Sequence, residues 1–240
     1  GSANATVAGG LVGVNSGNGT ISKCYATSDV TSDWTAGGLV GKSIGGSIQD
    51  SYATGDVTGV NIIGGLVGMA DAQAEINRTY YAQGEIYGFE GANATIGGLI
   101  GEGNATVENS YWDEEATTVY ESAGGTGLST DAMRNSTSYD GAWNFGDSNT
   151  WNQDEAYNGG YPYLTNSTFY LLQADVSPAD KGEVNWAGRY PHGSSAELVI
   201  YPDVGYGISE VTGCGGEFLG NVYTIDPVTA NCTLNATLDY

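Results

Sequence analysis

The chain has 240 residues, enough to bury one or two hydrophobic cores. Asp and Glu outnumber Lys and Arg by 28 to 6, and a net charge of -22 repels nucleic acids and anionic lipids. No apolar run reaches the ~20 residues of a transmembrane segment. We therefore expect no nucleic-acid partner and no membrane span. No cofactor is expected either, although the abundant carboxylates leave calcium binding open.

A five-residue phrase, GGLVG, organises the first half of the chain. It occurs three times unchanged and once with Ile in place of Val, at Gly9–Gly13, Gly37–Gly41, Gly64–Gly68 and Gly97–Gly101. The starts are separated by 28, 27 and 33 residues, a spacing typical of stacked repeats. With 39 Gly and few runs of helix-forming residues, the chain is expected to be all-β.

A second phrase follows each GGLVG. Its versions are CYATSDV from Cys24, SYATGDV from Ser51, YYAQGEI from Tyr80 and the degenerate SYWD from Ser110. One unit is too small to fold alone, whereas stacked units bury ladders of equivalent side chains. The pattern predicts a parallel β-helix with a right-handed crossover, glycine corners and an inward ladder formed by Leu11, Leu39, Leu66 and Leu99.

The two phrases together resemble the GLUG repeat of bacterial and archaeal surface proteins. The resemblance covers about residues 7–115 and, with the aromatic segment that follows, about residues 7–164. It implies an extracellular, adhesin-like or envelope-associated module without known catalytic residues. The third repeat departs from the pattern at Asn77–Tyr81, where one extra residue leaves open which Tyr joins the Tyr ladder, and a β-bulge is expected there.

Residues 1–115 are expected to form the solenoid, and residues 116–166 an irregular cap at its open end. Ser129 is an N-cap candidate for one short helix. Aromatic residues gather at Trp143, Phe145 and Trp151 and in the GGYPYL run from Gly159, and should be buried where another turn would otherwise stack.

Residues 167–240 are expected to form a small antiparallel β domain, because short alternating runs are separated by turn signals. About residues 169–240 resemble the bacterial repeat domains related to internalin-type B repeats, which are extracellular spacers. Of the three Cys, Cys214 and Cys232 lie 18 residues apart in this domain, and closing that loop would contribute on the order of 3 kcal/mol. We predict this disulfide, and a small buried thiol at Cys24.

Asn-x-Ser/Thr triplets occur nine times, against about three expected from the composition. This excess favours glycosylation at the surface. The candidates are Asn4, Asn18, Asn77, Asn93, Asn104, Asn135, Asn166, Asn231 and Asn235.

Several catalytic patterns are present but lack their context. Residues 36–43 match a permissive phosphate loop and residues 41–45 a nucleophile elbow, yet both overlap the second GGLVG, and the sole histidine, His192, lies in the other domain. Two acidic groups, Asp113–Glu115 and Asp154–Glu155, could supply a glycosidase pair, but a solvated acidic loop is the simpler interpretation.

These features predict a non-enzymatic protein that is secreted or displayed at the cell surface, acting as an adhesin or as the subunit of a filament or sheath. Its partners would be further copies of itself, neighbouring surface proteins or glycans. Two alternatives stay open: a polysaccharide-active β-helix enzyme, and a carbohydrate-binding module that uses exposed aromatic side chains.

Overall fold

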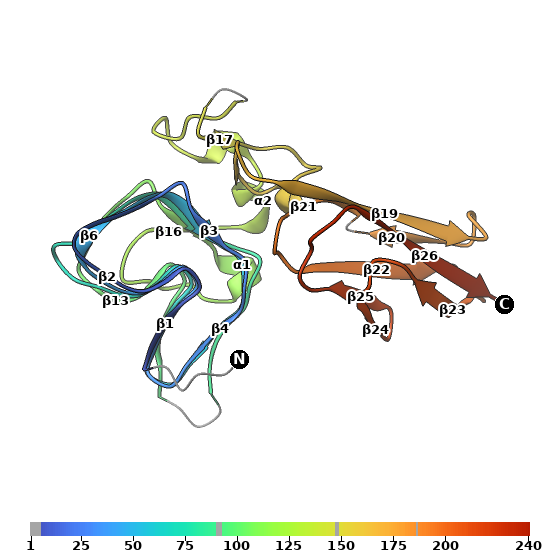
Figure 1. Ribbon diagram of the computed structural model, residues 1–240, viewed down its shortest axis with the longest axis horizontal. Helices are drawn as coiled ribbons and strands as arrows, with labels where there is room; N and C mark the ends of the chain where they lie inside the picture. The colour runs from blue at the N-terminus through green and yellow to red at the C-terminus, as the bar shows by residue number, and fades with distance from the viewer. Residues whose placement is uncertain (1–5, 90–92, 147–148, 186) are drawn as a thin grey trace. The chain divides into compact units, whose positions relative to one another are not determined.

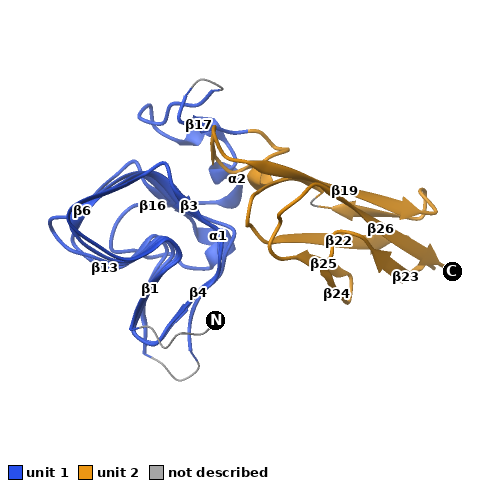
Figure 2. Cartoon of the chain, viewed as in Figure 1, with its two compact units in different colours: residues 1–153 blue, residues 154–240 orange. Residues whose placement is uncertain are grey.

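The structure is a computed structural model that describes residues 6–89, 93–146, 149–185 and 187–240. The chain forms two compact units, residues 1–153 and 154–240 (Figure 2). The segment 116–166, expected to be one cap, is thus divided between the two units.

Unit 1 is a parallel β-solenoid of about four turns, whose successive turns nearly superimpose in Figure 1. The first three turns contribute strands to three parallel sheets, and the fourth turn contributes strands to two of them. Sheet A contains β1 (Val7–Gly9), β5 (Thr35–Gly37), β8 (Ile62–Gly64) and β12 (Thr95–Gly97). Sheet C contains β4 (Val30–Ser32), β7 (Val57–Gly59) and β11 (Ile86–Gly88). Sheet B contains β2 (Val12–Ser22), β3 (Tyr25–Ala26), β6 (Val40–Ala53), β9 (Val67–Ala70), β10 (Glu75–Tyr81), β13 (Ile100–Gly103), β14 (Thr106–Glu108), β15 (Tyr111–Asp113) and β16 (Thr126–Leu128).

The leucines of the GGLVG phrase form one column across the turns. The Leu11 N–H donates to the Leu39 carbonyl at 3.0 Å, and the same bond links Leu39 to Leu66 and Leu66 to Leu99, both at 2.9 Å. Leu39, Leu66 and Leu99 are fully buried, whereas Leu11, in the first turn, is 44% exposed. The column therefore lines the core but reaches solvent at the N-terminal end.

Glycine is required at the paired positions because backbone atoms approach too closely to leave room for a Cβ. Positive φ angles are not the reason. A Cβ on Gly37 would lie 2.1 Å from the Val40 carbonyl oxygen, and one on Gly38 would lie 2.2 Å from the Gly65 carbonyl oxygen of the next turn. The left-handed conformation occurs elsewhere, at the equivalent corner residues Lys23, Asp50, Arg78 and Asn109, with φ between 47° and 54°. The expected glycine corners are thus close-packing positions, and polar residues take the strained corner.

The third repeat contains no bulge at Asn77–Tyr81. Thr79 pairs with Ser51 and Tyr80 with Tyr52 in unbroken register, because Arg78 occupies the same left-handed corner as Asp50. Tyr80 therefore joins the Tyr column, and Tyr81 points into the core with Ala53 and Trp112. The longer third period arises after Tyr81: Ile86 pairs with Val57 and Thr95 with Ile62.

The segment expected to close the solenoid does so only in part. Residues 119–128 cover the end: the Gly98 N–H donates to the Glu121 carbonyl at 2.9 Å and the Ala123 N–H to the Ile100 carbonyl at 3.0 Å. Trp143 and Trp151 pack instead against the Tyr rings of sheet B, and Phe145 packs against Trp143. The GGYPYL run belongs to unit 2. The short elements of this region are α1 (Glu114–Thr117), α2 (Thr130–Met133), η1 (Ser136–Ser138) and β17 (Trp151–Asn152). The Ser129 cap is confirmed, since its Oγ accepts the Ala132 N–H at 3.3 Å.

Unit 2 is built from two four-stranded sheets that share one apolar core. One sheet has the order β21-β19-β26-β23 and the other β20-β22-β25-β24. The expected small antiparallel β domain is confirmed, with one exception: β19 and β26 run parallel, whereas the other pairs of these two sheets are antiparallel. The elements are η2 (Asn158–Gly160), β18 (Tyr163–Leu164), β19 (Phe169–Ser177), β20 (Gly182–Asn185), β21 (Gly188–Pro191), β22 (Ala196–Pro202), β23 (Gly207–Thr212), β24 (Glu217–Leu219), β25 (Val222–Ile225) and β26 (Cys232–Asp239).

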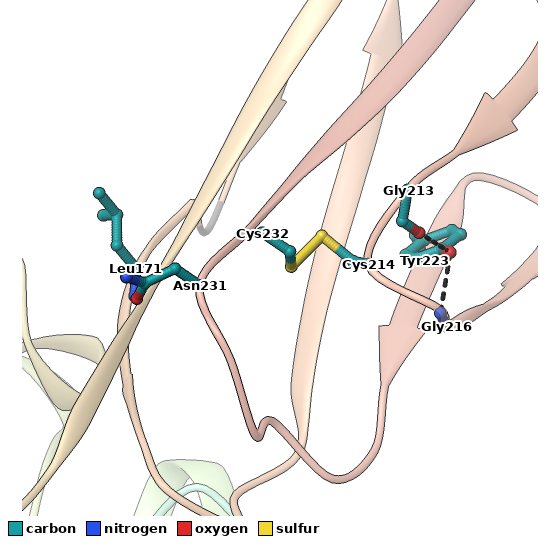
Figure 3. The surroundings of a disulfide bond; sticks show 7 residues. All are labelled: Leu171, Gly213, Cys214, Gly216, Tyr223, Asn231 and Cys232. Atoms are coloured by element: carbon teal, nitrogen blue, oxygen red, sulfur yellow. Dashed lines mark hydrogen bonds between the residues drawn. A yellow bond between two sulfur atoms is a disulfide. The ribbon is translucent and has the colours of Figure 1, made fainter.

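A disulfide joins Cys214 and Cys232 in unit 2 (Figure 3). It links the turn after β23 to the first residue of β26. Beside it, the Tyr223 hydroxyl donates to the Gly213 carbonyl and accepts the Gly216 N–H at 2.9 Å. The bridge therefore fixes the loop between the two sheets, and Cys24 is the free cysteine of the chain.

The Leu column gives a first prediction. Leu66→Ala should destabilise unit 1 by about 2–5 kcal/mol, because it leaves a cavity in the middle of the solenoid. Leu11→Ala, the matched control at the exposed end of the same column, should cost less than about 1.5 kcal/mol. Denaturant unfolding followed by Trp fluorescence measures both, since four of the five Trp residues lie within residues 1–153. Equal losses would contradict the stacked column.

Candidate functional site

The polar residues of the second phrase connect one turn to another. The Asp29 Oδ1 accepts the Asp56 N–H at 2.9 Å, and the Asp56 Oδ1 accepts the Glu85 N–H at 2.8 Å. The Ser51 Oγ accepts the Cys24 N–H at 3.1 Å, and the Ser110 Oγ accepts the Thr79 N–H at 3.2 Å. These Asp and Ser residues of the repeat therefore hold backbone amides of a neighbouring turn in place.

The Tyr column is the largest aromatic feature of unit 1. The Tyr25 and Tyr52 rings stack at 5.2 Å and the Tyr52 and Tyr80 rings at 4.9 Å, with nearly parallel planes. Trp151 packs obliquely against both Tyr52 and Tyr80, at 6.1 and 6.0 Å between centroids, and Trp143 packs against Tyr80 at 6.4 Å. Tyr52 and Tyr80 are thus covered by residues of the same unit and cannot form an open sugar-binding platform, whereas Tyr25 is partly exposed.

A charged group anchors this aromatic layer. The Arg78 guanidinium donates to both carboxylate oxygens of Asp50, at 2.7 and 2.9 Å, and the Trp151 indole N–H donates to the same carboxylate at 3.2 Å. The hydrogen bond to Asp50, together with its charge, raises the pKa of Arg78 above its ordinary value. Asp50 and Arg78 come from corners of adjacent turns, so the pair ties two turns to the aromatic segment. Sequence reasoning missed this group, because an isolated Asp and Arg 28 residues apart carry no recognisable motif.

The acidic residues considered as catalysts have structural roles. Asp113 is fully buried and caps α1, accepting the N–H groups of Glu115 and Ala116 at 3.1 and 2.9 Å. The Glu115 Oε2 accepts the Thr130 N–H at 2.9 Å, and the Asp154 Oδ1 accepts the Ala156 N–H at 2.8 Å. Asp113, Glu115 and Asp154 therefore each hold backbone amides of short helices or turns.

The remaining catalytic patterns involve Ser43 and His192. Ser43, shared by the phosphate-loop and nucleophile-elbow patterns, is buried in sheet B, and its hydroxyl donates to the Gly45 carbonyl at 3.1 Å. His192 is exposed in unit 2, with its ring edge-on to Tyr170. Within the described residues, no group of three or more His, Cys, Asp or Glu side chains is arranged to hold a metal ion.

Most of the candidate glycosylation residues lie at the surface. Asn18, Asn93, Asn104, Asn135, Asn166, Asn231 and Asn235 are exposed, Asn77 is partly buried, and Asn4 lies outside the described residues. The Asn231 side chain also accepts the Leu171 N–H at 2.7 Å (Figure 3). Cys24 is only partly buried, which corrects the expected buried thiol, because it lies in the less covered first turn.

The comparisons with known proteins identify the repeat. The family model of the GLUG motif matches residues 4–31 and 32–58, the first two units of the repeat. No curated protein and no solved structure matches the chain. None of the helices among the described residues has the length and apolarity needed to cross a membrane. The resemblance of residues 169–240 to internalin-type B repeats stays a prediction.

The core phenol of Tyr81 predicts a pH dependence. Burial, and then the negative charges of Asp56, Asp29 and Glu85, raise the Tyr81 pKa well above its ordinary value of 10.0. The unfolded chain therefore releases this proton above about pH 10, where the folded chain still holds it, so stability present below pH 10 is lost as the pH rises further.

Tyr81→Phe removes the ionisable hydroxyl. Between pH 8 and pH 11 the free energy of unfolding of this variant should therefore fall less than that of the parent. The variant also lacks the hydrogen bond from the hydroxyl to the Gly55 carbonyl, at 2.9 Å, and should be less stable than the parent at pH 8. Urea unfolding at both pH values measures the difference. An identical pH response in both proteins would contradict the assignment.

Proposed function

We propose that this protein is a non-enzymatic structural module of an extracellular surface, glycosylated on exposed asparagines and acting as an adhesive element or as a building block of a filament or sheath. The observation that carries the proposal is that the Leu, Gly, Ser and Asp residues of the repeat make contacts between successive turns. A stack of such turns forms a stiff scaffold, and its exposed surface is the part that contacts other molecules.

Three further features support an extracellular location. GLUG repeats and a β-solenoid fit a surface or structural repeat protein. A disulfide is compatible with an oxidising compartment, since such bonds are rare in reducing cytosol. Seven of the Asn-x-Ser/Thr asparagines are exposed where a glycan would meet solvent. Of the carboxylates considered for an enzyme acting on polysaccharides, Asp113, Glu115 and Asp154 accept hydrogen bonds from backbone amides, and for this reason we favour the structural role over that alternative.

Glycosylation and location can be tested on the protein from its native source. Treating intact cells with an impermeant protease should remove it from the surface, and peptide mass spectrometry should find glycans on exposed sites such as Asn104 and Asn135. Asn77 is the internal control, because it is partly buried and the Thr79 of its triplet is buried and bonded to Ser110. A protein that is protected inside intact cells and carries no glycan would overturn the proposal.

A further inference from the structure

One of the nine Asn-x-Ser/Thr triplets contains a cysteine of the disulfide. In the triplet that begins at Asn231 the middle residue is Cys232, which is bonded to Cys214 (Figure 3). The other eight triplets contain no cysteine. The same three residues are therefore a substrate for two covalent reactions, addition of a glycan to the Asn231 amide and oxidation of the Cys232 thiol.

The folded domain holds this triplet on both sides. On one side β26 pairs with β19, and Thr233 lies opposite Gln173. On the other side the backbone passes so close that a Cβ on Gly213 would lie 2.1 Å from the Thr233 carbonyl oxygen. Acceptor triplets ordinarily lie in surface loops, where a glycosyltransferase can enclose the asparagine and the hydroxyl-bearing residue together. Because Thr233 is only partly exposed and lies in a paired strand, the folded domain gives the enzyme no such access.

A glycan on Asn231 is nevertheless compatible with the folded domain. The side chain is exposed, and its Oδ1 accepts the Leu171 N–H at 2.7 Å (Figure 3). Glycosylation takes place at Nδ2 and retains the carbonyl oxygen, so the hydrogen bond from Leu171 can persist in the glycosylated protein. The glycan therefore has to be added before the strand is paired, and it can remain afterwards.

We propose that glycosylation of Asn231 competes with closure of the Cys214–Cys232 bridge, so that the redox conditions during folding set the fraction of chains that carry this glycan. The inference rests on the proposed surface glycoprotein and describes how one of its sites is regulated. Cys214 lies 18 residues before Cys232, so the partner thiol is already present when the triplet is synthesised.

The two competing reactions use different co-reactants. In glycosylation, the Asn231 Nδ2 forms a bond to the anomeric carbon of a sugar, the bond from that carbon to the phosphate of a lipid-linked oligosaccharide breaks, and the amide loses one proton. In closure of the bridge, the two thiols pass two electrons and two protons to a disulfide oxidant. A stronger oxidant therefore favours the bridge over the glycan.

Glycopeptide mass spectrometry tests the competition on the full chain, secreted from a host that glycosylates its exported proteins. Cys214→Ser keeps the triplet intact but removes the bridge, and it should raise Asn231 occupancy at least about twofold, because the triplet then stays accessible for longer. Cys24→Ser removes a thiol outside the bridge and should leave this occupancy unchanged.

Asn235 is the matched site within the same strand. It is paired with both β19 and β23, and its triplet contains no cysteine, so Cys214→Ser should not change its occupancy. Equal rises at Asn231 and Asn235 would mean that the fold, and not the bridge, limits access. That result, or the same Asn231 occupancy in the parent and in Cys214→Ser, would overturn the proposal.

Reduction during synthesis supplies a second measurement that does not depend on how well a variant folds. Brief treatment of the secreting cells with dithiothreitol should raise Asn231 occupancy in the parent and leave Cys214→Ser unchanged, because the variant has no bridge to lose. No rise in the parent, or an equal rise in both proteins, would contradict the competition. Both experiments use a foreign host, so their failure leaves the proposed surface location and glycosylation of the native protein standing.

Discussion

The spacing between successive turns is the constraint on which unit 1 depends. Parallel strands lie about 4.8 Å apart, and at this distance a Cβ on Gly37 or Gly64 would lie 2.5 Å from the backbone nitrogen of Gly68 or Gly101 in the next turn. The second glycine of each pair makes room for the neighbouring turn and for core rings: a Cβ on Gly65 would lie 2.3 Å from Tyr81 and one on Gly98 would lie 2.2 Å from Trp112. The GGLVG phrase is thus repeated because every turn must satisfy the same steric limit.

The repeat made much of this fold predictable. Four phrases in phase predicted the parallel solenoid and the Leu column, Ser129 predicted α2, and the spacing of Cys214 and Cys232 within one small domain predicted the disulfide. Other features lay beyond the sequence because they depend on which way a residue faces. Tyr80 and Tyr81 are both aromatic, so the pattern could not show which one enters the core. The aromatic segment was assigned to the open end because nothing in its sequence reveals that the outer face of the Tyr column needs a cover.

Pairing between strands that are distant in the sequence could not be predicted from the sequence either. β19 and β26 are the first and last long strands of unit 2, and their parallel register joins Leu172 to Cys232 across 60 residues. Turn signals report only pairings between neighbours in the chain, and these are antiparallel. The group formed by Asp50, Arg78 and Trp151 could not be predicted for the same reason. Its members meet because left-handed corners of adjacent turns coincide, and local sequence does not encode that coincidence.

The two units are stabilised in different ways, and both ways suit a surface protein. Unit 1 gains most from repetition, since each turn buries apolar side chains and ties its Ser and Asp residues to the next turn, so no covalent link is needed. Unit 2 is smaller and its eight paired strands share a single core, so its hydrophobic gain is limited and a disulfide that constrains the unfolded chain contributes relatively more. The repeat family and the disulfide are independent observations on separate units. Both are compatible with the extracellular location proposed above.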